Sequence, residues 1–388
     1  MHRRLIATLA AAALSVLPAA HAARTASDSA EPGEPAEEPA AAAPALPRID
    51  PAPPPSPSDP VLPLSLRLPT DNRALLEGRP DAFYMGVDRQ VDGKPALVWQ
   101  AGQFGYVRNP VKHREDTVFV RLHEGLDIAP TLRDKRGEPL DLVRSIADGR
   151  VVFINPVPGA SNYGLHVIVE HNWGYGTFYS LYAHLMRIDA TLGATVRCGE
   201  TLGRLGYTGR GIDRRRAHVH LELNMLLSER FEDWQRKSDP SSANAPNLYH
   251  GFNLAGLDVA ALFTALANDP TLTLPRFLAS QTPYFRVLAP AGPNPPSLLR
   301  RYPWLNPNAT SPTTPPACPS YEITLTATGL PLSIIPSPQS TPIPIVIATV
   351  PFDGRHSWRT SGRLGGTGTA AELTAKGTQY VQLLTGRW

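Results

Sequence analysis

In the first two-thirds of the chain, apolar residues occur in short runs separated by turn residues. Several runs alternate apolar and polar positions, and most are bounded by Gly, Pro or Asn. Runs of this length with such boundaries are typical of β-strands. The clearest lie at 82–85, 96–99, 151–154, 165–169 and 177–181. The pattern predicts a mainly β protein, with order beginning near Leu64 and a compact antiparallel β domain over residues 63–240.

The periodicity changes after residue 223. Two segments carry apolar residues at helical spacing, and Asp258 is placed to cap the second. Two later segments alternate or are rich in β-branched residues, as strands are. The segments are 225–234 and 257–267 for helices, and 321–325 and 345–350 for strands. We therefore predict that residues 241–388 form an α+β extension, made of a helical segment, a proline-rich stretch and a small β-rich unit.

Proline content modifies this picture. The chain has 42 prolines, about twice average usage. Many fall at 31–60 and 290–319, in segments with few aromatic residues that cannot bury enough apolar surface to pack. Residues 23–62, rich in Pro, Ala and Glu, are predicted to be a disordered linker.

The first 22 residues follow the pattern of a secretory signal peptide. Arg3 and Arg4 precede an apolar run at 5–17, and small residues lead to a cleavage position after Ala22. A membrane anchor is the alternative, but the run is shorter than the roughly 20 residues of a spanning helix. We expect an exported protein, periplasmic or extracellular, with no membrane span in its mature form. Cleavage would lower the formal positive excess from three to one, which gives no indication of nucleic-acid binding.

The two cysteines, Cys198 and Cys318, would enter an oxidising compartment after export, where a disulfide is possible. They lie in different predicted domains, so two unpaired thiols are at least as consistent with the sequence. Neither has the neighbouring cysteine that a zinc-binding pair requires.

Candidate chemistry begins with two histidines on one predicted strand. His218 and His220 flank Val219, so both imidazoles face one side while Val219 faces the core. Such a pair alone is more often a surface feature than a ligand set. Upstream, His123 and Asp127 offer an imidazole and a carboxylate four positions apart. These two with one strand nitrogen would make three protein ligands and leave a fourth position for water, as in catalytic zinc sites.

The segment at His123 has two other interpretations. One is a loop histidine beside an aspartate that caps a turn. The other is the helical H-E-x-x-H zinc motif with Glu124 as the base. That motif fails because residue 127 is Asp, Gly125 weakens a helix, and the flanking residues are typical of strands.

A third motif, Tyr182-Ala183-His184-Leu185, follows an aromatic strand. A lone histidine in this position is usually structural. Hydrolysis at a zinc ion, however, needs nearby groups that transfer protons and stabilise an oxyanion. His184 and the strand histidine that does not bind the metal could serve in this way.

The order of these motifs resembles the lysostaphin-type zinc metalloendopeptidases, which cleave peptidoglycan. The chain has H-x-x-x-D, then Y-A-H-L, then H-x-H, with a G-x-x-L-G-x-x-G-x-T-G run at 199–209. The resemblance covers about 64–223 and is strongest from His123 onward. It implies a compact, largely antiparallel β domain with a groove over the metal.

The resemblance also implies roles for five residues. The Zn²⁺ ligands would be His123, Asp127 and His220, while His184 and His218 would assist catalysis. The implied partner is the peptide cross-link of peptidoglycan, with a peptidase activity that uses a metal-activated water.

The chain departs from the family pattern in two places. Residues 211–217, with three consecutive arginines, replace a short Gly-Pro lead into H-x-H, and the segment 130–142 is longer than usual. The arginines are interpreted either as a solvated charge run or as a contact for a substrate carboxylate. His166 and His171, on another predicted strand, are interpreted as structural.

Three functions remain open: an active peptidoglycan endopeptidase, a non-catalytic relative that binds or regulates peptidoglycan, and a zinc peptidase that acts on a non-wall peptide. The presence of all five residues disfavours the second. Specificity depends on groove loops that a single sequence does not reveal. The segment 302–305 and the aromatic residues Tyr284 and Phe285 could stack on glycans, although aromatics near prolines more often pack.

Overall fold

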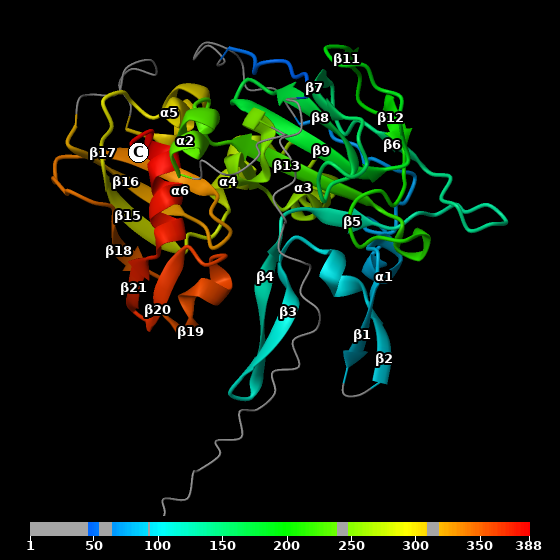
Figure 1. Ribbon diagram of the computed structural model, residues 1–388, viewed down its shortest axis with the longest axis horizontal. Coiled ribbons are helices and arrows are strands. Elements are labelled where there is room, and N and C mark those ends of the chain that lie inside the picture. Colours follow the sequence, from blue (N-terminus) through cyan, green and yellow to red (C-terminus); the bar gives the residue numbers. More distant parts are fainter. Residues whose placement is uncertain (1–45, 54–63, 92–93, 239–246, 309–317) are drawn as a thin grey trace, which may run out of the picture. The chain divides into compact units, whose positions relative to one another are not determined.

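Strands buried along most of their length form the central sheet. The computed structural model describes residues 46–53, 64–91, 94–238, 247–308 and 318–388, all within the compact unit Pro39–Trp388. The largest sheet is antiparallel, in the order β11-β7-β8-β9-β13-β14, with β5 also paired to β13 (Figure 1). Its strands are β5 (Leu126–Ile128), β7 (Gly149–Asn155), β8 (Leu165–Asn172), β9 (Thr177–Leu185), β11 (Thr195–Val196), β13 (Val219–Leu226) and β14 (Leu254–Gly256).

Strand β13 has a different partner on each half of its outer edge. Strand β9 pairs with it on one side, while β5 pairs with its first half and β14 with its second half. This register sets His220 opposite both Asp127 and Ala183. Because β14 follows residue 240, the C-terminal region completes the sheet, and the predicted boundary at 240 does not divide two separate sheets.

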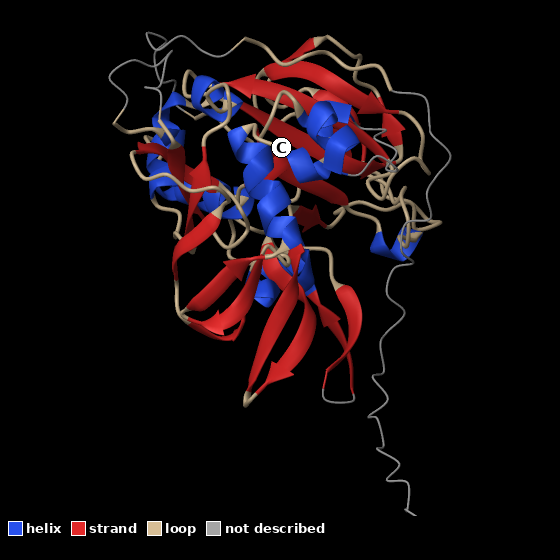
Figure 2. Cartoon of the chain, turned by 60° about the vertical axis from the view of Figure 1, so that its left-hand side comes forward, coloured by secondary structure: helices blue, strands red, loops and turns tan. Residues whose placement is uncertain are grey.

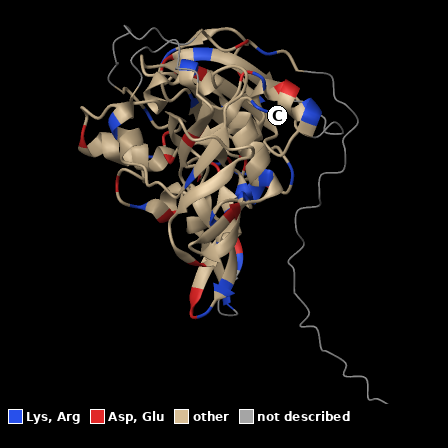
Figure 3. Ribbon diagram, turned by 90° about the vertical axis from the view of Figure 1, so that its left-hand side faces the viewer, with Lys and Arg blue, Asp and Glu red and all other residues tan. Residues whose placement is uncertain are grey.

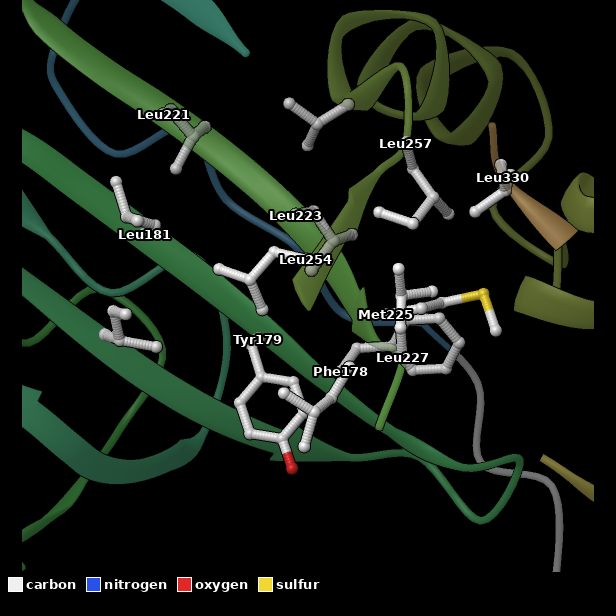
Figure 4. Packing of buried hydrophobic residues seen from close by; sticks show 14 of the residues in the cluster. Phe178, Tyr179, Leu181, Leu221, Leu223, Met225, Leu227, Leu254, Leu257 and Leu330 are labelled. Carbon is white, nitrogen blue, oxygen red and sulfur yellow. The ribbon is translucent and has the colours of Figure 1, made fainter. Parts of the chain in front are cut away.

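The core extends from the central sheet into the C-terminal region. Every residue of β9 and β13 is buried, which requires cover on both faces of these strands. Leu330, from the C-terminal region, belongs to the same cluster of buried residues as Leu223 and Met225 (Figure 4). Full burial of one such side chain contributes about 1.5–3 kcal/mol. The two regions therefore share one hydrophobic core.

Smaller sheets and hairpins surround the central sheet. In Figure 1 the β1–β2 and β3–β4 hairpins both point away from it. They consist of β1 (Val87–Val91) with β2 (Lys94–Val98) and β3 (Gly105–His113) with β4 (Asp116–His123), and a third sheet joins β10 (Arg187–Ile188), β12 (Thr201–Arg204) and β6 (Leu142–Arg144). The predicted strand at 82–85 is wrong: residues up to Phe83 form the short helix α1 (Pro80–Phe83), which begins at a proline.

The C-terminal region is α+β, as predicted, and it shows helices packed against strands (Figure 2). The predicted helix at 225–234 is wrong in its first half, because pairing with β14 keeps the chain extended to Leu226. The helix from Val259 is confirmed, with Asp258 accepting a hydrogen bond from the Ala261 N–H at 2.9 Å. The elements are α2 (Phe231–Ser238), α3 (Val259–Asn268), α4 (Leu274–Ala279), α5 (Ser297–Arg301), α6 (Ala375–Thr385), the sheet β15 (Phe285–Pro290), β16 (Ser320–Leu325), β17 (Pro331–Ser337) and β18 (Ile345–Thr349), and the sheet β19 (Phe352–Arg355), β20 (Leu364–Gly368) and β21 (Ala370–Leu373).

Aromatic residues after the α5 helix are used for packing. Tyr302 is fully buried, and its hydroxyl donates to the Thr177 carbonyl at 2.7 Å while accepting from the Leu226 N–H at 2.9 Å. Trp304 stacks on Tyr175 with the ring centroids 5.2 Å apart. These contacts join the C-terminal region to β9 and β13. Tyr302 is therefore not available to stack on a glycan.

Part of the predicted linker makes defined contacts. Residues 46–53 lie inside the segment 23–62, yet the Ile49 N–H donates to the Val152 carbonyl at 2.8 Å and Arg48 pairs with Glu232. The predicted signal peptide at 1–22 and most of the predicted linker lie outside the described residues. Within the described part, no helix has the length and apolar character needed to cross a membrane. Cys198 and Cys318 are both unpaired.

Candidate metal centre

Three strands bring the predicted ligands together. His123 ends β4, Asp127 lies in the middle of β5, and His220 lies in β13. The His123–Asp127 segment is strand, turn and strand, so the helical H-E-x-x-H alternative is excluded. One potential ligand atom from each of the three residues lies within 4.8 Å of the others. The sequence prediction of a three-residue cluster therefore agrees with the geometry.

Gly125 lets the β4–β5 turn approach β13 closely. A Cβ atom at this position would lie 2.4 Å from the Leu221 carbonyl oxygen and 2.9 Å from His220 Nε2. The glycine is required for this close approach of two backbones, because any side chain would push His123 and Asp127 away from His220.

Asp127 Oδ1 is the centre of the cluster. It lies 3.1 Å from His123 Nε2, 2.9 Å from His220 Nδ1 and 3.4 Å from His218 Nε2. His123 Nε2 and His220 Nδ1 are themselves 3.1 Å apart. Two imidazole nitrogens and one carboxylate oxygen thus converge on one point.

Each converging group is oriented by a second contact that the sequence analysis did not identify. His123 Nδ1 is 2.7 Å from the Gln103 carbonyl oxygen, and His220 Nε2 is 2.9 Å from Glu222 Oε1. Arg108 Nη2 is 2.5 Å from Asp127 Oδ2, the oxygen that faces away from the cluster. Such outer contacts fix the ring orientation and the tautomer of metal ligands. Glu222 could have been found from its position two residues after His220 on the same strand face.

Glu222 is held in a buried network of its own. Tyr163 donates its hydroxyl hydrogen to Oε1 at 2.7 Å, and the Asn224 amide donates to Oε2 at 2.8 Å. Burial opposes its ionisation, but the hydrogen bond and charge of His220 hold the pKa of the carboxyl below its ordinary value. Glu222 therefore remains an anion that accepts from His220.

The pKa values of the cluster show how one buried carboxylate serves several imidazoles. Burial opposes the charge of Asp127, but the neighbouring His123 and His218 hold its pKa well below the usual range. Burial also opposes the charge of His220, yet hydrogen bonds to Asp127 and Glu222 raise its pKa to about 9. Burial lowers the pKa of His123. A metal bound at His220 Nδ1 must displace a proton there, so its affinity depends on pH.

The donor set fits zinc. Two imidazole nitrogens and one carboxylate oxygen, each oriented by an outer hydrogen bond, are the three-ligand set of catalytic zinc sites. Such a set leaves one position for water or substrate.

His184 and His218 lie beside the cluster, as predicted. Their ring centroids are 4.7 Å apart, and that of His184 is 5.9 Å from that of His220. His218 Nδ1 donates to the Arg216 carbonyl at 2.6 Å, and His184 Nδ1 donates to the Thr208 carbonyl at 2.9 Å. Burial and the neighbouring imidazoles hold the pKa of His184 well below its ordinary value, so its ring is neutral and its Nε2 atom is the unprotonated acceptor.

His184 has an unusual backbone conformation. Its φ is 61°, in the left-handed region that residues with a side chain rarely adopt. Its N–H donates to the Tyr163 carbonyl at 2.9 Å. Strain of this kind persists where the surroundings impose it and is concentrated at functional sites.

The three arginines Arg214–Arg216 form the short 3-10 helix η2; Arg214 and Arg215 are exposed and Arg216 is half-buried. Arg214 pairs with Glu138 at 3.3 Å and Arg215 with Asp213 at 3.5 Å. These local contacts are what a solvated charge run makes.

The strands thus bring together a His–Asp–His group that could hold a metal ion, with two further histidines beside it. Residues 121–231 match the family model described as Peptidase family M23. The resemblance to lysostaphin-type enzymes is thereby confirmed. Members of this family are zinc-dependent and the three-residue group could hold a metal ion, so the predicted cofactor is confirmed as well.

Solved structures give further matches of low overall similarity. One is the catalytic domain of a variant of the prophage-encoded M23 protein EnpA from Enterococcus faecalis, at 23% identity over 31% of this chain and 79% of that one, with a TM-score of 0.22. Another is the catalytic domain of lysostaphin from Staphylococcus simulans, at 22% identity over 31% and 75%, with a TM-score of 0.22. A zinc-containing peptidase from Vibrio cholerae matches at 26% identity over 37% and 36%, with a TM-score of 0.24. A comparison with curated proteins found no match.

Proposed function

We propose that this protein is an exported zinc metalloendopeptidase that hydrolyses peptide cross-links in peptidoglycan. The observation that carries the proposal is the convergence of His123, Asp127 and His220 with two further imidazoles directly beside them. Family M23, which residues 121–231 match, includes peptidoglycan-cleaving zinc endopeptidases. The signal-peptide pattern at 1–22 supports export to the compartment that contains this substrate.

His123 Nε2, Asp127 Oδ1 and His220 Nδ1 would hold the zinc ion. When bound, zinc polarises a carbonyl oxygen and lowers the pKa of water to about 7. Glu222 and the Gln103 carbonyl keep the two ligand rings in place, and Arg108 holds Asp127 so that Oδ1 faces the centre.

His184 and His218 would transfer protons. Burial and the neighbouring His218 and His220 hold the pKa of His184 well below its ordinary value, so its ring is neutral near pH 7. Because Nδ1 of His184 donates to a backbone carbonyl, its Nε2 can accept a proton from water and return it to the leaving amine. The His218 ring, fixed by a similar bond at Nδ1, lies directly beside it. A positioned acid–base group of this kind contributes about 10²–10⁴-fold in rate.

The decisive experiment is digestion of purified peptidoglycan sacculi, with fragments identified by mass. Wild-type protein should release peptide fragments, chelated protein should release none, and His184→Ala should release them at least about 10²-fold more slowly. His113→Ala, a histidine on the β3–β4 hairpin outside the cluster, should behave as wild type. If wild type releases no fragments, the wall substrate is wrong. Cleavage that survives chelation would remove zinc from the mechanism.

Export can be tested separately. Full-length protein expressed in a bacterium should be recovered outside the cytoplasm with its amino terminus at Ala23. A variant that lacks residues 2–22 should stay in the cytoplasm. Recovery of an uncleaved chain in the cytoplasm would contradict the proposal.

A further inference from the structure

The segment 207–216, here called the arginine loop, holds both of the histidines that lie beside the metal centre. The Thr208 carbonyl accepts from His184 Nδ1 at 2.9 Å, and the Arg216 carbonyl accepts from His218 Nδ1 at 2.6 Å. Only the width of one imidazole ring separates each carbonyl from the Nε2 atom of the same histidine. Side chains near the two ends of the loop are therefore within reach of a peptide whose scissile bond lies at the metal centre.

The arginine loop is supported by the segment 130–142, which also departs from the family pattern. Arg133 of that segment donates to the Arg214 carbonyl at 2.8 Å and to the Arg215 carbonyl at 3.3 Å. The two departures from the family pattern therefore contact each other beside the metal centre. A loop that is fixed in this way needs little ordering when a ligand binds.

Positive charge is concentrated in the arginine loop. Figure 3 shows the two signs of charge interspersed over most of the chain. The loop, by contrast, carries four arginines and one aspartate, a net charge of +3, which equals the formal net charge of the whole chain. Charge of one sign beside a site raises the local concentration of a ligand of the opposite sign. The loop therefore favours an anionic group next to His184 and His218.

The four arginines of the loop are not equivalent. Arg214 and Arg215 each pair with an acid. Arg210 and Arg216 pair with no acid in the part of the chain that the structure describes. Each of these two unpaired arginines lies within two residues of a carbonyl that fixes one of the two histidines. The charges without a counter-ion are thus the ones nearest to the site.

Arg216 is the more constrained of the two unpaired arginines. It is half-buried, whereas Arg210 is exposed. Its Nη1 donates to the Gly211 carbonyl at 2.8 Å, and its Nε is buried with no hydrogen-bond partner among the described residues. A guanidinium that is partly withdrawn from water without an acidic partner is costly for the folded chain. A bound anion would supply the missing counter-charge.

We propose that Arg216 and Arg210 form a specificity subsite that binds a free carboxylate of the peptide substrate next to the scissile bond. Gly211, whose carbonyl holds the Arg216 guanidinium, directly follows Arg210, so the two cations belong to one place in the loop. The inference rests on the proposed peptidase function and names its substrate class. A peptide offers carboxylates as its anionic groups, and a guanidinium matches a carboxylate with two parallel hydrogen bonds. A hydrogen bond to a charged group corresponds to roughly 10- to 100-fold in specificity.

The test uses two synthetic peptides that contain a peptidoglycan cross-link bond. They are identical except that the residue beside the scissile bond has a free carboxylate in one and a carboxamide in the other. Wild type should cleave the carboxylate peptide with about 10-fold or higher kcat/KM, through a lower KM. Arg216→Gln keeps a donor for the Gly211 carbonyl but removes the charge, so it should reduce this preference to less than about 3-fold by raising KM for the carboxylate peptide. Arg210→Gln should reduce the preference by a smaller factor.

Arg215→Gln is the matched control, because Arg215 belongs to the same loop but already pairs with Asp213. It should keep the wild-type preference. A loss of preference in Arg215→Gln as large as that in Arg216→Gln would show a general effect of charge and would overturn the subsite. If the Arg216 side chain served only to hold the loop and His218, Arg216→Gln would lower kcat for both peptides by the same factor, and the subsite would again be wrong.

Binding of both peptides to full-length His184→Ala, measured by calorimetry, separates the subsite from the proposed chemistry. A preference for the carboxylate that disappears in His184→Ala/Arg216→Gln supports the subsite even if wild type hydrolyses neither peptide, an outcome that would refute only the peptidase function. Equal affinity of His184→Ala for the two peptides, binding of neither, or equal kcat/KM in wild type would overturn the subsite while leaving the hydrolase intact.

Discussion

The histidines at the metal centre and those on strand β8 differ although all of them are buried. His171 uses both nitrogens: Nδ1 donates to the Asp148 carbonyl at 2.7 Å, and Nε2 lies 2.7 Å from Ser180 Oγ. Its ring stacks on Trp173. His220 also contacts an acceptor with one nitrogen, but its other nitrogen points at a carboxylate that two more imidazoles share. Burial does not distinguish structural from functional histidines here; the direction of the second nitrogen does.

The same difference shows in the pKa values. Burial lowers the pKa of both His166 and His171 to about 4, because neither has an anionic partner in direct contact. At the metal centre, hydrogen bonds to two carboxylates overcome the burial of His220 and raise its pKa to about 9. The β8 histidines therefore affect stability, whereas the others surround a site that can bind a cation.

The largest effect is expected from Asp127→Asn, which removes the carboxylate on which the cluster converges. We expect loss of bound zinc and a decrease in kcat/KM of about 10³-fold or more, because the metal stabilises the transition state by several kcal/mol. Elemental analysis measures the zinc content, and a peptide hydrolysis assay measures kcat/KM. Asp189→Asn, an acid paired with Arg187 at the surface, is the control. Normal zinc content in Asp127→Asn would contradict the assignment.

The next largest effect is expected from His184→Ala and His218→Ala. Each should lower kcat by about 10²–10⁴-fold while zinc stays bound, because neither residue belongs to the three-ligand group. His171→Gln should leave kcat near the wild-type value at pH 7.5. Loss of zinc in His184→Ala would show that His184 is a metal ligand, contrary to the assignment of the three-residue group.

A smaller effect is expected from Glu222→Gln, which keeps the shape but removes the charge that His220 contacts. Zinc affinity should fall by about 10- to 100-fold, as measured by competition with a chelator. Glu170→Gln changes another buried acid, one that pairs with Arg150 at 2.9 Å, and should leave zinc affinity unchanged. Equal zinc affinity of wild type and Glu222→Gln would mean that Glu222 serves packing alone.

The smallest effect concerns stability. The pKa of His171 is about 4 in the folded chain and 6.5 as its ordinary value. As pH falls, the unfolded chain therefore binds a proton at His171 before the folded chain does. The stability that neutral His171 contributes is complete above pH 6.5 and is lost between pH 6.5 and 4. One such group changes the unfolding free energy by about 1.4 kcal/mol per pH unit within that window. In urea unfolding of the full chain, His171→Gln should reduce the slope of the unfolding free energy against pH, between pH 4 and 6.5, by about 1.4 kcal/mol per pH unit. An unchanged slope would contradict the shift.

Local pattern predicted much of the fold. The alternation around Val219 placed His218 and His220 on one face, and the structure confirms Val219 as a fully buried residue. The pattern failed at 82–85, where Pro80 starts a helix, and near Leu226, where pairing with β14 overrides helical spacing. In both places short apolar runs fit a helix or a strand equally well, so local information does not decide between them.

The sequence by itself determined which atoms could bind a metal, because ligand chemistry and strand periodicity depend only on residue type and spacing. The spacing of His123 from Asp127 and of His218 from His220 gave the candidates, and the resemblance to lysostaphin-type enzymes chose His220 from the strand pair. Only the tertiary structure decided what surrounds these atoms: Glu222 behind His220, Arg108 behind Asp127, and a cavity at Arg108 that the C-terminal region partly lines. Strand register and packing bring Arg121 and Lys376, which are far apart in the sequence, to the lining of one cavity. A local sequence pattern cannot predict such proximity.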